Sequence, residues 1–524
     1  MGWAVVPNRL VAANDDCNAR RPTPKNIHSN PRTLILAMPS FSDLLDKVLA
    51  DTLACQDETT PQYASRAMSN YPPLGAFLGR GYPTTDAALD AVCEIADRFR
   101  TNDKSLALTV TRDQWRMTVS NAIGANLDAL LHEADGKGRW SMLRDDLKEI
   151  TGNVGLDLVH YTAVWLFVGQ ELEPFSIGPV RFFPREAWAD EVGTRLGSDP
   201  EWREPLALLW GGRQPRGRSV LAGARALLRG LTAGRLTRAN WRDTFRFHSE
   251  AAEPSRNSNA RSMVRFAHPD QWIASAHVVG FAPDASNKRG LLATRVALDT
   301  IRLVLGQGRR HMIRTAADNV TPLSVDGISQ AQGADVSRRW QTNRPGVSGA
   351  PGLAQTIITS SGALFEAAGR CIEAGTKVPS AHGCPKLAER WLNACHWFGR
   401  ACLSDADFTA VVMLVISLDV LCGGLMEKGI VELVARLHDI PASQQVLSGM
   451  TLRKLVEETY KLRSEVAHGS ILAVNGQLDV ERSKLEGLAA VAIGEYAIKL
   501  DAYAARGGRD DRDDFRASLP AFKP

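Results

Sequence analysis

The sequence predicts a mainly α-helical protein, in which a larger N-terminal α+β region with few short strands precedes a C-terminal antiparallel helical bundle. Its 524 residues are 44% hydrophobic and 23% charged, proportions that are ordinary for a globular protein with sizeable buried cores. Apolar residues recur at spacings of three and four along most of the chain, which indicates amphipathic helices. Strand-like patterns are confined to two stretches, within 161–190 and 271–281.

The first 37 residues have no clear hydrophobic period and contain many turn-forming residues. We expect residues 1–37 to be either a disordered arm or a non-native extension. If they are a non-native extension, Met38 is the natural start. They lack the basic segment and the long apolar stretch of a secretion signal. From Met38 the pattern becomes an amphipathic helix capped by Ser42. This helix opens a region, 38–345, that we interpret as a sensor or regulatory region.

Within 38–345 the sequence predicts helices interrupted by a few strands. Between Tyr161 and Asp190 the order expected is a helix, a Gly-Pro turn, a short aromatic strand and a second helix. The other expected elements are helices over 84–100 and 119–134, a strand over 271–281, and a helix over 286–305 with Ser286 as its N-cap.

An arginine-rich segment, 213–265, lies inside this region. It contains twelve arginines, no lysine and three acidic residues, so its local charge is twelve minus three, or +9, in a chain of +4. Aromatic residues are interleaved with the arginines, as in surfaces that contact RNA phosphates and stack on bases. The alternative is a solvated surface whose arginines pair with acids elsewhere. The candidate RNA-binding residues are Arg235, Arg238, Trp241, Arg242 and Arg246.

The C-terminal part is predicted to be helical throughout. A linker containing Pro and Gly is expected at 346–355, a helical domain at 356–505 and a disordered charged tail at 506–524. The expected helices cover 386–403, 405–426, 430–439, 451–469 and 485–505. The second of these is apolar almost all round, and we expect it at the centre of the bundle. Asp419 interrupts its apolar run, which leaves too short a stretch to span a membrane.

The stretch YKLRSEVAHGS, residues 460–470, carries the candidate catalytic residues. Thr451 is expected to cap its helix and Gly469 to end it. At about 100° per residue, Arg463 falls on the apolar stripe and His468 lies about 140° further round. Either the helix distorts before Gly469, or the groups that complete a site come from a second copy of the chain. An arginine and a histidine at this spacing are expected about once by chance in a chain of this composition. The alternative interpretation is a helix-end arginine with a capping histidine.

LRSEVAHG, late in an all-helical domain, resembles the HEPN superfamily, specifically the ApeA-like HEPN branch of bacterial defence proteins. The residues that match its motif are Arg463, Ser464 and His468, and Asp419 matches an acidic residue of the family's central helix. Residues 168–188 and 278–305 are similar to the region that accompanies this type. The resemblance implies metal-independent RNA cleavage at a composite site of a dimer, with a 2′,3′-cyclic phosphate and a 5′-hydroxyl as products. Histidine suits the proton transfers, arginine suits the phosphate, and Ser464 would orient Arg463.

We therefore expect a cytoplasmic bacterial endoribonuclease that acts as an anti-phage or toxin-like effector. Its partners would be an RNA substrate, a second copy through the HEPN domain and a phage-derived trigger, with no membrane association. No cofactor or metal is expected, because the nearest cluster, His382, Cys384, Cys395 and His396, fits no common zinc spacing. The alternative is a non-catalytic HEPN dimerisation or scaffold module with an N-terminal ligand- or protein-sensing domain.

Overall fold

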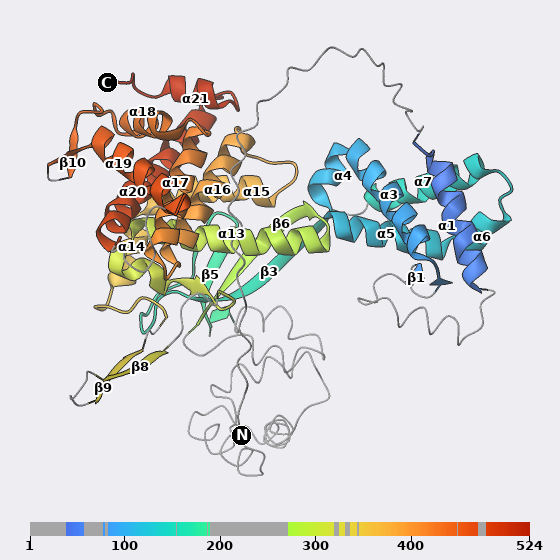
Figure 1. Ribbon diagram of the computed structural model, residues 1–524, viewed down its shortest axis with the longest axis horizontal. Coiled ribbons are helices and arrows are strands. Elements are labelled where there is room, and N and C mark those ends of the chain that lie inside the picture. The colour runs from blue at the N-terminus through green and yellow to red at the C-terminus, as the bar shows by residue number, and fades with distance from the viewer. Residues whose placement is uncertain are drawn as a thin grey trace, which may run out of the picture.

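The computed structural model describes residues 38–56, 77–78, 82–152, 155–185, 187–188, 271–318, 324–330, 336–342, 345–447, 449–469 and 478–524. The described chain is mainly helical and carries a small antiparallel sheet (Figure 1). This agrees with the predicted class. Residues 1–37 and the arginine-rich segment 213–265, with all five candidate RNA-binding residues, lie outside the described residues.

A first group of helices, at the N-terminal end, has a hydrophobic core of its own. Its elements are α1 (Phe41–Gln56), β1 (Phe77–Leu78), β2 (Tyr82–Pro83), α3 (Asp86–Asn102), α4 (Lys104–Thr109), α5 (Arg112–Ala125), α6 (Leu127–His132) and α7 (Gly136–Gly152). The helix predicted over 119–134 is thus two helices, α5 and α6. Ala282 belongs to the same core, and its N–H donates to the Thr109 carbonyl oxygen at 2.9 Å.

A five-stranded antiparallel sheet of order β4-β5-β6-β3-β7 follows. Its strands are β3 (Leu156–Trp165), β4 (Phe175–Ile177), β5 (Val180–Pro184), β6 (Trp272–Phe281) and β7 (Arg314–Thr315), and a separate hairpin joins β8 (Ser324–Gln330) to β9 (Val336–Thr342). The predicted strand over 271–281 is confirmed as β6. The predicted helix that begins at Tyr161 is wrong, because Tyr161 pairs with Ser275 inside the sheet.

Helix α13 (Pro283–Val304) is the central element, since it packs on β3 and β6 and also on α15, α16 and α20. The sheet, α13 and the bundle therefore form successive layers around one continuous hydrophobic core (Figure 1). Ser286 is not the N-cap of α13, because the helix begins at Pro283 after Ala282. Its buried hydroxyl instead forms a hydrogen bond with His160 Nε2 of β3 at 2.7 Å.

The helical bundle completes the fold. The elements after α13 are η2 (Gln307–Met312), α14 (Leu353–Ser360), α15 (Gly362–Thr376), α16 (Pro385–Cys402), α17 (Asp407–Cys422), α18 (Met426–His438), β10 (Gln445–Leu447), β11 (Met450–Thr451), α19 (Leu452–Ala467), α20 (Asp479–Ala505) and α21 (Arg512–Ser518). Helix α17 packs on α16, α18, α19 and α20, as expected for its uniformly apolar sequence. No single described helix is long and apolar enough to cross a membrane, and α17 with α18 reaches that length only as a pair bent by 69°.

The sheet and the bundle meet at a close backbone contact. Gly178, in the turn between β4 and β5, has φ +56° and lies against Gly369 of α15. A Cβ atom on either glycine would collide with the backbone of the other. The contact therefore requires glycine at both positions, and it fixes how closely α15 approaches the sheet.

Two parts of the predicted domain division are corrected by the structure. The expected linker at 346–355 is docked on the sheet, because the Val347 N–H donates to the Leu166 carbonyl oxygen at 2.6 Å and Val347 is fully buried. The expected disordered tail at 506–524 instead forms α21, and Phe515 packs between Tyr496 and Tyr503. Charge and Gly content suggested disorder, whereas the buried Phe515 and Leu519 hold the segment on the bundle, and Asp510 accepts hydrogen bonds from the first N–H groups of α16.

Candidate functional site at the end of helix α19

Helix α19 begins and ends as the sequence predicts. The Thr451 hydroxyl accepts a hydrogen bond from the Lys454 N–H at 3.3 Å. At the other end, the His468 N–H donates to the Ser464 carbonyl oxygen at 2.9 Å, and Gly469 adopts φ +73°. The α-helical hydrogen-bonding pattern thus continues up to His468, and the glycine stops it.

Burial decreases along α19. Leu452, Leu455 and Val456 are buried in the first turns, whereas residues 459–466 include no fully buried side chain. Arg463 and Ser464 are half-buried, and His468 is exposed. Arg463 lies on the same face of α19 as the buried apolar residues, as predicted. Near Arg463, however, that face is only partly buried by neighbouring elements. Arg463 therefore avoids the desolvation cost that full burial of a guanidinium would bring.

The two candidate catalytic side chains do not converge within one chain. Because α19 stays regular up to His468, Arg463 and His468 point about 140° apart around the helix axis. The first of the two alternatives, a distortion of the helix before Gly469, is therefore excluded. The side chains of Arg463, Ser464 and His468 form no hydrogen bond or ion pair with any described residue. Within the described part of the chain, no other residue occupies the polar groups of these three side chains.

Asp419, the acidic residue of the central helix, has a structural role. Its Oδ1 accepts a hydrogen bond from the Met426 N–H at 2.9 Å and lies 3.5 Å from the Cys422 sulfur. These contacts close the corner between α17 and α18, where Met426 adopts a positive φ of 56°. Asp419 thus stabilises the turn that follows α17, and its match to the family pattern stays a prediction.

Metal ligation finds no support in the described part of the chain, which holds no group of three or more His, Cys, Asp or Glu side chains placed to bind an ion. Cys384 precedes the first turn of α16, and Cys395 lies eleven residues further along. At about 1.5 Å per residue their backbone positions are about 16 Å apart along the helix axis, too far for both thiols to bind one metal ion.

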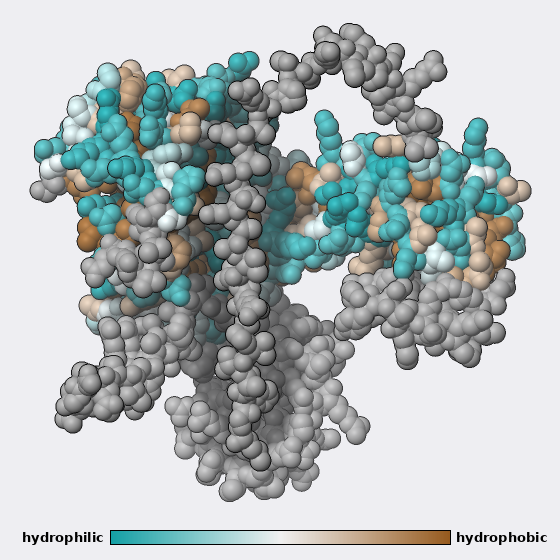
Figure 2. Space-filling model, viewed as in Figure 1, coloured by the Kyte–Doolittle hydropathy of each residue, from teal (hydrophilic) through white to brown (hydrophobic). Residues whose placement is uncertain are grey.

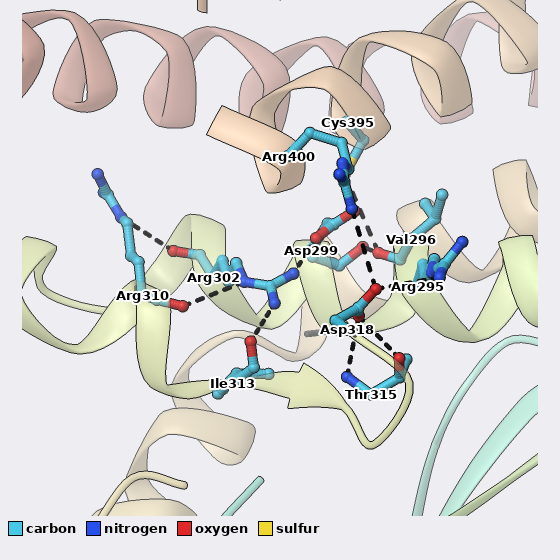
Figure 3. Close-up of polar contacts among 11 residues, drawn as sticks. Arg295, Val296, Asp299, Arg302, Arg310, Ile313, Thr315, Asp318, Cys395 and Arg400 are labelled. Carbon is cyan, nitrogen blue, oxygen red and sulfur yellow. Dashed lines mark hydrogen bonds and ion pairs between the residues drawn. The ribbon is translucent and has the colours of Figure 1, made fainter. Parts of the chain in front are cut away.

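Sequence reasoning missed a layer of buried charged residues between α13 and its neighbours (Figure 3). Arg302 is buried and donates to Asp299 and to the carbonyl oxygens of Arg310 and Ile313. Burial raises the pKa of Asp299 to about 7, because desolvation outweighs the attraction of Arg302. Arg295, Asp299 and Arg302 stand at positions i, i+4 and i+7 of α13. That spacing on one helical face was the signal that could have revealed the layer.

The same layer extends to the start of α20. Arg310 forms an ion pair with the buried Glu486 at 3.4 Å, and Arg482 contacts Glu486 at 2.8 Å and Asp407 at 2.9 Å. Two arginines thus meet two carboxylates, and the charges balance. Arg482 and Glu486 stand at an i, i+4 spacing that is visible in the sequence, whereas the pairs that Arg310 forms with Glu486 and Arg482 forms with Asp407 join distant segments and give no local pattern.

Comparison of the chain with protein-family models, with curated proteins and with solved structures gives no match. The interpretation of the α19 site rests on its own geometry and on the motif.

Proposed function

We propose that the protein is a metal-independent endoribonuclease of the HEPN type, whose active site forms from two copies of the chain. The main support is that Arg463 and His468 have no hydrogen-bond or ion-pair partner among the described residues. The Arg463 guanidinium is half-buried and the His468 imidazole is exposed. They diverge by about 140° on one regular helix. A single copy of the motif offers one histidine, whereas general acid and general base catalysis of RNA cleavage uses two proton-transfer groups.

The proposed reaction balances without water or a metal ion. One His468 takes the proton of the ribose 2′-hydroxyl as its oxygen bonds to phosphorus. The His468 of a second copy protonates the 5′-oxygen as the P–O bond breaks. Arg463 from each copy stabilises the negative charge on the phosphorane, and Ser464 orients the guanidinium or contacts the phosphate. The products are a 2′,3′-cyclic phosphate and a 5′-hydroxyl.

Helix α20 offers a surface on which a second copy could dock. Val480, Val491 and Ile498 are 52%, 57% and 36% exposed. Their spacings of eleven and seven place them within about 20° on one face of this 27-residue helix. Hydrophobic residues also reach the surface at the left edge of the bundle, where Figure 1 places α19 and α20 (Figure 2). An aliphatic row of this length is typical of a helix that pairs with another helix.

The motif and its resemblance support a cellular role as an anti-phage or toxin-like effector. In this role the N-terminal helices and the sheet would sense a phage-derived trigger and restrain the nuclease. The chain would act in the bacterial cytoplasm, where RNA is its substrate.

The test is RNA cleavage by the purified full-length chain in the presence of EDTA. We expect products whose 5′ ends are labelled by polynucleotide kinase without prior phosphatase treatment, and whose 3′ ends resist phosphatase until acid opens the cyclic phosphate. His468→Ala should lower the rate by about 10²-fold or more, and Arg463→Ala by a similar factor. Lys461→Ala is the matched control, because this residue of the same helix is exposed and its only ion pair among described residues is with Glu465, at 3.7 Å.

Two results would contradict the proposal. If His468→Ala cuts RNA as fast as the unmodified chain, the active site lies elsewhere. If the unmodified chain cuts no RNA, alone or with phage lysate, the non-catalytic dimerisation module is the better interpretation.

A further inference from the structure

A second cluster of cations lies on the far side of the charged layer, around Asp318. The carboxylate of Asp318 accepts two hydrogen bonds from Thr315, from its N–H at 3.2 Å and its hydroxyl at 2.7 Å. Its other oxygen lies 3.0 Å from an Arg295 nitrogen and 3.9 Å from an Arg400 nitrogen. The two arginines approach from α13 and α16, and Figure 3 shows both side chains directed at this carboxylate.

The charges of this cluster do not balance. Two guanidinium groups share one carboxylate, whereas the adjacent pairs match one arginine with one acid or two with two. Exposure adds to the asymmetry, because the Asp318 side chain is 4% exposed while those of Arg295 and Arg400 are 29% and 39% exposed. The accessible side of the cluster is therefore positive.

The cluster also contains buried polar atoms without partners. Arg295 Nε and His396 Nδ1 are both buried, and neither has a hydrogen-bond partner. His396 stands one turn before Arg400 on α16. Burial is the main cause that lowers the pKa of His396, and the positive charges of Arg400 and Arg295 lower it further. It is therefore a neutral imidazole close to two cations. A buried polar group without a hydrogen-bond partner destabilises the fold, and a ligand with several acceptor oxygens could supply the missing partners.

We propose that Arg295, Arg400 and His396 bind a phosphate group at a site separate from the end of α19. Guanidinium groups on two different helices can grip separate oxygens of a tetrahedral anion, and arginine matches phosphate geometry with paired donors. The anion would neutralise the excess charge that Asp318 leaves. A free nucleotide and an RNA backbone carry the same chemical group, so the experiment has an arm for each.

The position of the site gives the bound phosphate a structural consequence. Arg295 lies on the helix that packs on the sheet, and Arg400 lies in the last turn of α16 in the bundle. A phosphate held by both would fasten these two layers together. The site does not depend on the proposed nuclease, because its ligand is read by binding and not by RNA cleavage.

The test is isothermal titration calorimetry on the full-length chain at constant ionic strength, with inorganic phosphate, adenosine monophosphate and a short single-stranded RNA as probes. We expect saturable binding of phosphate or the mononucleotide at one site per chain. Arg400→Ala and His396→Gln should each weaken it tenfold or more. Arg370→Ala is the matched control, because the exposed Arg370 is balanced by Asp501 and its loss should leave affinity unchanged.

The RNA arm identifies the source of the phosphate group. If RNA is the only probe that binds, and Arg400→Ala weakens RNA binding tenfold, the site binds the phosphate groups of a nucleic-acid backbone. The proposal is overturned if no probe binds, or if Arg400→Ala and His396→Gln bind every probe as the unmodified chain does. Circular dichroism of both variants shows whether they are folded, so that a loss of binding is not confused with unfolding. Arg400→Lys is a second variant at this position, which retains the charge without the paired donors.

Discussion

The charged layer around α13 and the end of α19 use the same residue types in opposite ways. In the layer, Arg302 and Arg310 are buried, and each meets a carboxylate and backbone carbonyl groups. At the end of α19, Arg463 and His468 contact the solvent and have no partner among the described residues. A charge that is fully paired is committed to the fold, whereas an accessible unpaired charge can be used for binding and chemistry. Substitutions in the two regions should therefore separate stability from activity.

The largest effect is expected from Arg302→Ala. This change removes a buried guanidinium and leaves Asp299 and two carbonyl oxygens without their donor. Breaking a buried pair in this way costs about 3–5 kcal/mol of unfolding free energy. Urea unfolding followed by circular dichroism measures it. A loss below about 1 kcal/mol would show that water reaches the layer and that the comparison with α19 is wrong.

The second effect concerns pH and Asp299. Its native pKa of about 7 stands above its ordinary value of 3.8, so the native state holds this proton more tightly than the unfolded state. The contribution of Asp299 to stability is therefore present below about pH 4 and is lost as pH rises to about 7, at up to about 1.4 kcal/mol per pH unit. The unfolding free energy of the unmodified chain, measured relative to Asp299→Asn, should fall between pH 5 and pH 7 and level off above pH 8. A difference that stays constant between pH 5 and pH 8 would mean that Arg302 keeps the Asp299 carboxylate ionised in the native state.

These two regions also show what sequence can predict. Helix α19 was predicted with both ends because Thr451, the apolar spacing and Gly469 are all local signals. Strand β3 was mistaken for a helix because its partner, β6, lies more than a hundred residues away. The part of the charged layer that joins Arg310 to Glu486 was out of reach for the same reason, because the two residues come together only through the packing of distant helices. The part on α13 does have a local pattern, the spacing of Arg295, Asp299 and Arg302 on one helical face.

A smaller effect on stability, with a clear effect on assembly, is expected from Val491→Glu. Val491 lies in the middle of the exposed row on α20, so a carboxylate there costs little in a single copy. If α20 joins two copies, the two added charges would face a hydrophobic contact and prevent it. Sedimentation equilibrium should then show a monomer where the unmodified chain is a dimer. An unmodified chain that remains a monomer during RNA cleavage would exclude a composite site.

The smallest effect on stability is expected at the candidate site itself. Arg463→Ala and His468→Ala remove side chains that contact no described polar partner, so each should change the unfolding free energy by no more than about 0.5 kcal/mol. RNA cleavage should nevertheless fall by about 10²-fold in both variants. Stability and cleavage are measured on the same protein preparations, with Lys461→Ala as the control for both. A loss of several kcal/mol in Arg463→Ala would show that this arginine belongs with Arg302 as part of the fold, and it would remove the distinction between the two regions.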